Sequence, residues 1–126
     1  MNRVIVVGLA LSLCSLAVHA QQGIVGKYNG TLVRASGKSS GITIEITSAE
    51  NGKLKGSYTS HGRGVCGGIF PIEGTYQGNK LEFTAAKGGP TGDCLERKFE
   101  VVSDGDKLVG QMLQQSGDSG KVQLSK

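Results

Sequence analysis

The chain has 126 residues, and its 14 basic and 10 acidic side chains give a formal net charge of +4. Tryptophan is absent and aromatic residues make up only 5% of the sequence, which argues against a base-stacking platform for nucleic acid. The lysines are spread along the chain rather than gathered in one run, so the charge is only a weak indication of an anionic partner.

The first 20 residues have the pattern of a secretory signal peptide. Arg3 is followed by an apolar run over residues 4–18, and the segment ends in a cleavage-site pattern at Val18-His19-Ala20. The apolar run is shorter than the roughly 20 residues of a membrane-spanning helix. We therefore expect cleavage after Ala20, no stable membrane insertion, and a periplasmic or secreted protein. The mature chain, residues 21–126, has the length of a single domain.

Cleavage removes Cys14 and leaves two cysteines, Cys66 and Cys94. In an exported chain, two cysteines most simply form one disulfide. Closing this loop of 28 residues would stabilise the fold by about 3.5 kcal/mol. A zinc site needs four ligands, and His61 is the only histidine of the mature chain, so no metal site is expected.

One hairpin pattern recurs along the mature chain. Asn51-Gly52 provides the two residues of a tight primed turn, and the residues after it alternate between apolar and polar around Leu54. Similar segments surround Leu81 and Leu108, and the leucines of these three segments lie at a constant spacing of 27 residues. A fixed period indicates that one supersecondary unit is repeated, in this case two strands and a turn.

These patterns predict an all-β fold, an antiparallel eight-stranded meander that closes into a small barrel or a barrel-like sandwich. The strands are expected at residues 26–34, 41–48, 53–60, 69–76, 80–86, 94–103, 107–115 and 121–125. In the sixth strand, the inward residues are expected to be Leu95, Arg97, Phe99 and Val101. Pro71 cannot donate to a ladder and belongs at an edge, a strand start or a bulge.

The connections fall into two length classes. Short turns at 50–52, 77–79 and 104–106 alternate along the chain with longer connections at 35–39, 61–68, 87–93 and 116–120. In a meander the two classes lie at opposite ends, which places Cys66 and Cys94 at the same end. Function usually lies on loops held by a rigid scaffold, so the end with the longer connections is the candidate face.

Several polar residues approach this end on the inward side of their strands. The candidate ligand-binding residues are Arg34, Tyr58, Ser60, Arg97 and Gln114. Two guanidinium groups in one barrel mouth suit a carboxylate or a phosphate, which arginine can bind with two hydrogen bonds. The alternative is that both arginines lie at the rim, with their aliphatic stems on apolar surface and their charges in water.

The two longest connections suggest a protein-binding surface instead. Its candidate residues are His61, Arg63, Lys87 and Asp93. His61 beside Ser60 also raises the alternative of a weak hydrolase, which would need an orienting carboxylate such as Asp93. The sequence contains no other catalytic signature, so no catalytic residue and no cofactor are assigned.

The segment Gly26-Lys27-Tyr28, the Gly-x-Leu-x-Gly-x-Tyr pattern at 52–58 and the number of strands resemble avidin-like and lipocalin-like small barrels of bacterial exported proteins. Because those barrels use tryptophan in their sites and this chain has none, the resemblance implies no ligand. We expect an exported, non-enzymatic binding module that acts through one barrel end on a small anionic or amphipathic ligand or on a protein partner. The alternative is an inhibitor or immunity protein that blocks a secreted hydrolase or toxin.

Overall fold

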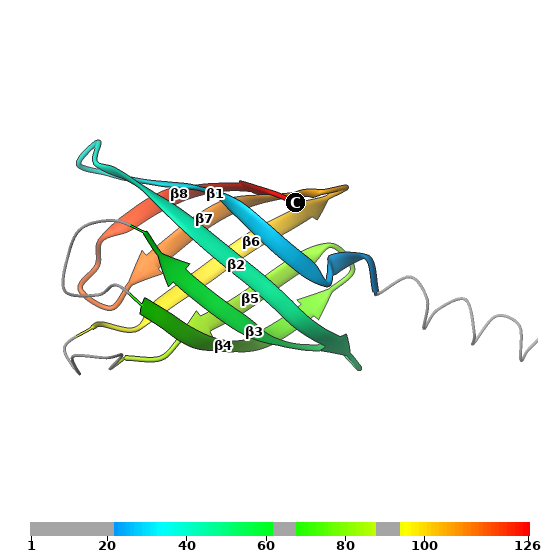
Figure 1. Cartoon of the computed structure of the whole chain (residues 1–126). Helices are drawn as coiled ribbons and strands as arrows, with labels where there is room; N and C mark the ends of the chain where they lie inside the picture. Colours follow the sequence, from blue (N-terminus) through cyan, green and yellow to red (C-terminus); the bar gives the residue numbers. More distant parts are fainter. Residues whose placement is uncertain (1–21, 62–67, 88–93) are drawn as a thin grey trace, which may run out of the picture.

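The computed structural model describes residues 22–61, 68–87 and 94–126, which form a closed barrel of eight antiparallel strands (Figure 1). The strands follow a short 3₁₀ helix, η1 (Gln22–Ile24), and are β1 (Gly26–Arg34), β2 (Ser39–Glu50), β3 (Lys53–Ser60), β4 (Gly68–Gln77), β5 (Lys80–Ala85), β6 (Arg97–Asp104), β7 (Lys107–Gln114) and β8 (Ser119–Ser125). Each strand pairs with the next, and β1 pairs with β8 to close the barrel. The predicted meander is confirmed, and it closes as a barrel.

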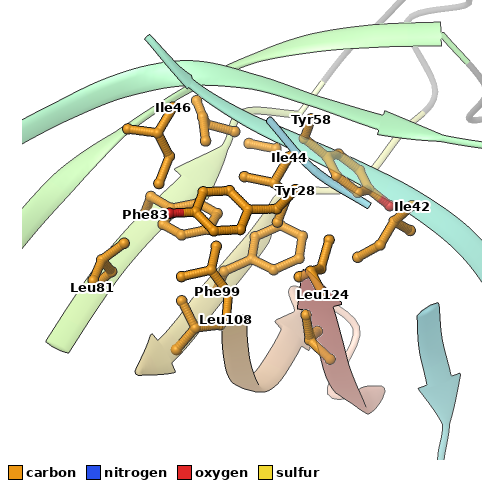
Figure 2. Close-up of a cluster of buried hydrophobic side chains, with 14 of the residues drawn as sticks. Tyr28, Ile42, Ile44, Ile46, Tyr58, Leu81, Phe83, Phe99, Leu108 and Leu124 are labelled. Carbon is orange, nitrogen blue, oxygen red and sulfur yellow. The ribbon is translucent and has the colours of Figure 1, made fainter. Parts of the chain in front are cut away.

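The barrel interior is the hydrophobic core, and alternation along each strand decides which side chains enter it. Tyr28, Ile44 and Phe99 are fully buried, and they meet side chains from the opposite wall (Figure 2). An eight-stranded barrel is just wide enough for its side chains to fill. The five largest fully buried side chains are Tyr28, Tyr58, Phe70, Phe83 and Phe99.

Six of the eight strands differ from their predicted bounds by one to three residues, and β6 and β2 are the most informative of these. β6 begins at Arg97, where pairing with Ala85 of β5 starts, so the predicted inward position of Leu95 is wrong and Leu95 is 38% exposed. β2 extends two residues beyond the prediction at each end, and a β-bulge lies between Ile46 and Ser48. The extra residue shifts the inward positions by one, so that Ala49 is buried and Ser48 is exposed.

The short turns have the backbone geometry that their residues predict. Asn51 and Gly52 both have positive φ, 55° and 79°, as a type I′ turn requires. In the next two hairpins only the first loop residue, Gly78 or Gly105, has a positive φ, 61° in each, which fits a type II′ turn. These turns fix the register of the strands that they join.

Glycines at inward positions allow neighbouring strands to approach closely. A Cβ atom on Gly56 would overlap the carbonyl oxygen of Glu45 and lie 3.0 Å from the Cα atom of Ile46. Gly74 and Gly110 are equally constrained by the strands beside them. This close approach of backbones allows the sheet to coil tightly enough to close.

Pro71 lies within a strand but at a break in one of its two ladders. It is paired with Ser57 of β3, whereas the pairing between β4 and β5 begins only at Ile72. Pro71 therefore lies just outside the β4–β5 ladder. This position is compatible with a proline nitrogen, which has no hydrogen to donate to a neighbouring strand.

The 3₁₀ helix η1 and the end of β8 lie at the barrel end that carries the short turns, which we call the turn end (Figure 1). Ile24 of η1 is buried there and accepts a 2.9 Å hydrogen bond from the hydroxyl of Tyr28. Lys126 Nζ donates to the carbonyl of Gly23 at 2.8 Å and lies 5.4 Å from the centre of the Tyr28 ring. Within the described ranges, no helix has the length and apolarity needed to cross a membrane.

Candidate functional site

The strand ends that the longer connections join lie at the opposite end of the barrel, which we call the loop end (Figure 1). They join β1 to β2, β3 to β4, β5 to β6 and β7 to β8. The predicted division into a turn end and a loop end is therefore confirmed by the strand topology. Every candidate site residue that the structure describes belongs to the loop end.

Arg97 is the most unusual residue at the loop end. It is the first residue of β6 and shares the inward face with Phe99, so its side chain enters the barrel and is only 3% exposed. Within the part of the chain that the structure describes, neither Nε nor Nη1 of Arg97 has a hydrogen-bond partner. A buried charge without a partner is unfavourable, and native structures rarely retain one without a reason.

Aromatic rings provide the only compensation that the described residues give to this charge. The Cζ atom of Arg97 lies 5.5 Å from the ring centre of Tyr58 and 5.6 Å from that of Phe70, both within cation–π range. Tyr58 also contacts Phe99, with ring centres 5.2 Å apart, and Phe99 stacks on Phe83 at 5.1 Å. The guanidinium thus lies at one end of a group of stacked and tilted rings inside the barrel. Figure 2 shows three of these rings, Tyr58, Phe99 and Phe83.

Arg34 reaches the same end but is already paired. Its Nη1 donates to Asp118 Oδ2 at 2.8 Å and to Gln114 Oε1 at 3.1 Å. Gln114 lies directly opposite Arg97 in the β6–β7 ladder, so these polar groups are neighbours across the mouth. The two arginines therefore differ: Arg34 is half-buried and paired with a carboxylate, whereas Arg97 is buried and its Nε and Nη1 find no hydrogen-bond partner among the described residues.

Ser60 and His61, which the sequence suggested as a catalytic pair, diverge. Ser60 ends β3 on the inward face that Tyr58 also occupies. The His61 ring lies over the outer wall, where Nε2 is 2.7 Å from the hydroxyl oxygen of Thr43. Successive strand residues face opposite sides, so the two side chains lie on different surfaces of the barrel. This arrangement does not support Ser60 as a nucleophile activated by His61.

The remaining candidate residues lie within or next to 62–67 and 88–93, which are not among the described residues. Lys87 is exposed just beyond β5. Arg63, Cys66 and Asp93 fall outside the described residues, so their predicted roles, including the disulfide, stay predictions. Cys94 is buried, with 2% of its surface exposed.

The described residues of the loop end carry more positive than negative charge. The basic residues are Arg34, Lys38, Lys87 and Arg97, and the acidic residues are Glu96 and Asp118. An excess of this sign attracts anions to the mouth. The described part of the chain contains no group of three or more histidine, cysteine, aspartate or glutamate side chains that could hold a metal ion.

Sequence reasoning missed two residues that define this site. Phe70 received no role, although its ring contacts the Arg97 guanidinium. Asp118 was part of an expected connection without a role, yet it neutralises Arg34. The sequence contained one indication of this ion pair: Asp118 lies in a loop-end connection, where a carboxylate is within reach of an inward arginine.

No protein-family model matches the chain, and no curated protein matches it. The functional interpretation therefore depends on the geometry of the site alone.

Proposed function

We propose that this protein is an exported, non-enzymatic binding protein that holds an anionic group of its ligand against Arg97 at the loop end. A single observation carries the proposal. Arg97 is 97% buried and has two nitrogen atoms without a hydrogen-bond partner among the described residues. Export, with signal cleavage after Ala20 and a disulfide between Cys66 and Cys94, is part of the same proposal.

The energetics favour a binding role for Arg97 over a purely structural one. A buried donor without an acceptor costs about 1–3 kcal/mol, and an ionised group costs more. A methionine or leucine at the same position would fill the space above Tyr58 and Phe70 without that cost. Retaining an arginine is advantageous when the missing acceptor comes from a ligand, because the cost is then recovered on binding.

Arg97 suits a carboxylate or a phosphate group. Its guanidinium presents several donors in a fixed plane that matches two oxygen atoms of such a group. Arg34 can contribute little further charge, because Asp118 already accepts its hydrogen bond. We therefore assign the primary contact to Arg97, with Gln114 beside it.

A protein partner is favoured over a small enclosed ligand by the filled interior. Tyr58, Phe70 and Phe99 occupy the space below Arg97, so the body of the ligand has to remain outside the column. Ile69, at the start of β4, is 72% exposed beside the predicted partner-binding connection 61–68. An acidic side chain on a partner, such as a secreted hydrolase that the protein inhibits, would satisfy Arg97 while the partner's surface covers the rim.

The first experiment tests the anion contact with defined probes. The ¹⁵N-labelled mature protein is titrated with acetate and with inorganic phosphate, and the Nε–H resonance of Arg97 and the amides of β6 and β7 are followed by NMR. We expect saturable shifts in the wild type that disappear in Arg97→Met and persist in Arg34→Met. Shifts that persist in Arg97→Met would disprove the assignment to Arg97.

The second experiment tests the protein partner. Wild type and Arg97→Met serve as matched baits for an envelope extract, because both expose the same surface and differ in one charge. A partner retained by the wild type and lost with the variant supports the proposal. A partner retained equally by both baits would show that the protein binds elsewhere.

A further inference from the structure

A second polar surface lies on the outer wall of the barrel, away from the mouth. A groove of about 370 Å³ crosses β1, β7 and β8 and is lined by Asn29, Gly30, Thr31, Lys107, Val109, Gln123, Leu124 and Ser125. This volume is within the range of about 300–1,000 Å³ that small-molecule sites occupy. The groove belongs to none of the candidate sites that the sequence suggested.

The lining is organised as two rows across the three strands. In the first row, Ser125 is paired with both Lys107 and Asn29. In the second row, Gln123 is paired with both Val109 and Thr31. Three neighbouring strands span roughly 10 Å, which suits a short extended ligand.

The amide of Asn29 is oriented by a chain of hydrogen bonds that begins at His61. The Thr43 hydroxyl donates to Asn29 Oδ1 at 2.8 Å, and it lies 2.7 Å from His61 Nε2. Because a hydroxyl has one hydrogen, the histidine nitrogen must be the donor in the second contact. Thr43 is covered by this arrangement and is only 8% exposed although it faces outward. Asn29 Oδ1 thus accepts from Thr43, whereas Asn29 Nδ2 makes no hydrogen bond to another described residue.

The groove offers donors and no carboxylate. Lys107 makes no ion pair with any residue that the structure describes, and the side chains of Gln123, Thr31 and Ser125 add an amide and two hydroxyls. The backbone groups between β1, β7 and β8 are used by the ladders, so a peptide has no free strand edge to extend here. Side-chain amides and hydroxyls in a shallow groove suit a ligand rich in hydroxyl groups, and Lys107 suits a negative charge on it.

We infer that this groove binds a short anionic saccharide, with Lys107 on the acidic group and with Asn29 and Gln123 on the hydroxyls. Thr43 is a positioning residue, because it acts through Asn29. The site is separate from Arg97 and does not depend on the proposed function of the loop end.

The test is an NMR titration of the mature protein with trigalacturonate, and galactotriose serves as the matched neutral probe. Trigalacturonate is expected to shift the amides of the two rows and to bind at least tenfold more tightly than galactotriose. Lys107→Gln should weaken binding roughly tenfold. Lys121→Gln, on the same wall but outside the groove, should change the affinity by less than about twofold.

Two further variants separate positioning from structure. Thr43→Val should weaken trigalacturonate binding, whereas Thr43→Ser, which keeps the hydroxyl, should retain it. The inference is overturned if trigalacturonate does not bind, if its shifts map to the mouth around Arg97, or if Lys121→Gln weakens binding as much as Lys107→Gln. Equal loss in the two Thr43 variants would overturn the positioning role.

Discussion

Replacing Arg97 with methionine should make the ligand-free protein more stable. Two unsatisfied donors, Nε and Nη1, each cost about 1–3 kcal/mol in the buried site. The contacts with Tyr58 and Phe70 return about 0.5–2 kcal/mol each. The difference, together with the apolar fit of methionine over the two rings, gives an expected gain of about 1–2 kcal/mol in the free energy of unfolding.

Urea unfolding followed by circular dichroism measures this gain, and guanidinium is avoided because it competes with arginine for the same contacts. Arg34→Met is the matched control. It breaks a partly exposed ion pair with Asp118 and should lower the free energy of unfolding by no more than about 1 kcal/mol. If Arg97→Met instead lost 1 kcal/mol or more, the rings would already satisfy Arg97, and the argument that it awaits a ligand would fail.

Three further predictions concern the scaffold. Gly56→Ala should lower the free energy of unfolding by about 3 kcal/mol, because the added Cβ atom would overlap the facing strand. Gly41→Ala is the control in the same urea titration and should be nearly neutral, because the nearest atom to its Cβ would be 3.8 Å away. Burial, with a smaller contribution from Asp106, raises the pKa of Tyr28 above 10.0, so the folded state favours the neutral phenol. The free energy of unfolding should therefore fall as the pH rises above that value, and the stability advantage of wild type over Tyr28→Phe should shrink between pH 8 and pH 11. Mass spectrometry of the mature protein should find Cys66 joined to Cys94, and the double serine variant should lose about 3.5 kcal/mol, whereas two unmodified thiols would disprove the disulfide.

The barrel was predictable because its signals are local and repeated. Asn51-Gly52 specifies a primed turn by itself, and the alternation at Ile42, Ile44 and Ile46 specifies which face is buried. The start of β6 was not predictable. Leu95 continues the apolar alternation of the strand, but the β5–β6 ladder already ends at the pair Ala85 and Arg97.

The site was predictable in its location but not in its electrostatics. Alternation brings Arg34, Arg97 and Gln114 inward, and the topology brings them to one end. Which arginine is neutralised depends on a carboxylate 84 residues from Arg34 along the chain, and such a contact leaves no periodic signal. The sequence therefore suggested two equivalent cations, whereas in the structure Arg34 is paired and Arg97 has two buried nitrogen atoms without a hydrogen-bond partner among the described residues.

Under the proposed function, the turn end contributes to stability and the loop end to recognition. At the turn end, η1, Tyr28 and Lys126 satisfy one another through hydrogen bonds and a cation–π contact, and the short hairpins leave little freedom. At the loop end, the buried Nε and Nη1 atoms of Arg97 have no hydrogen-bond partner among the described residues, and a rigid barrel tolerates this better than one that could relax and move the charge into water. If Arg97 binds a ligand as proposed, the ligand should stabilise the whole barrel in proportion to its affinity.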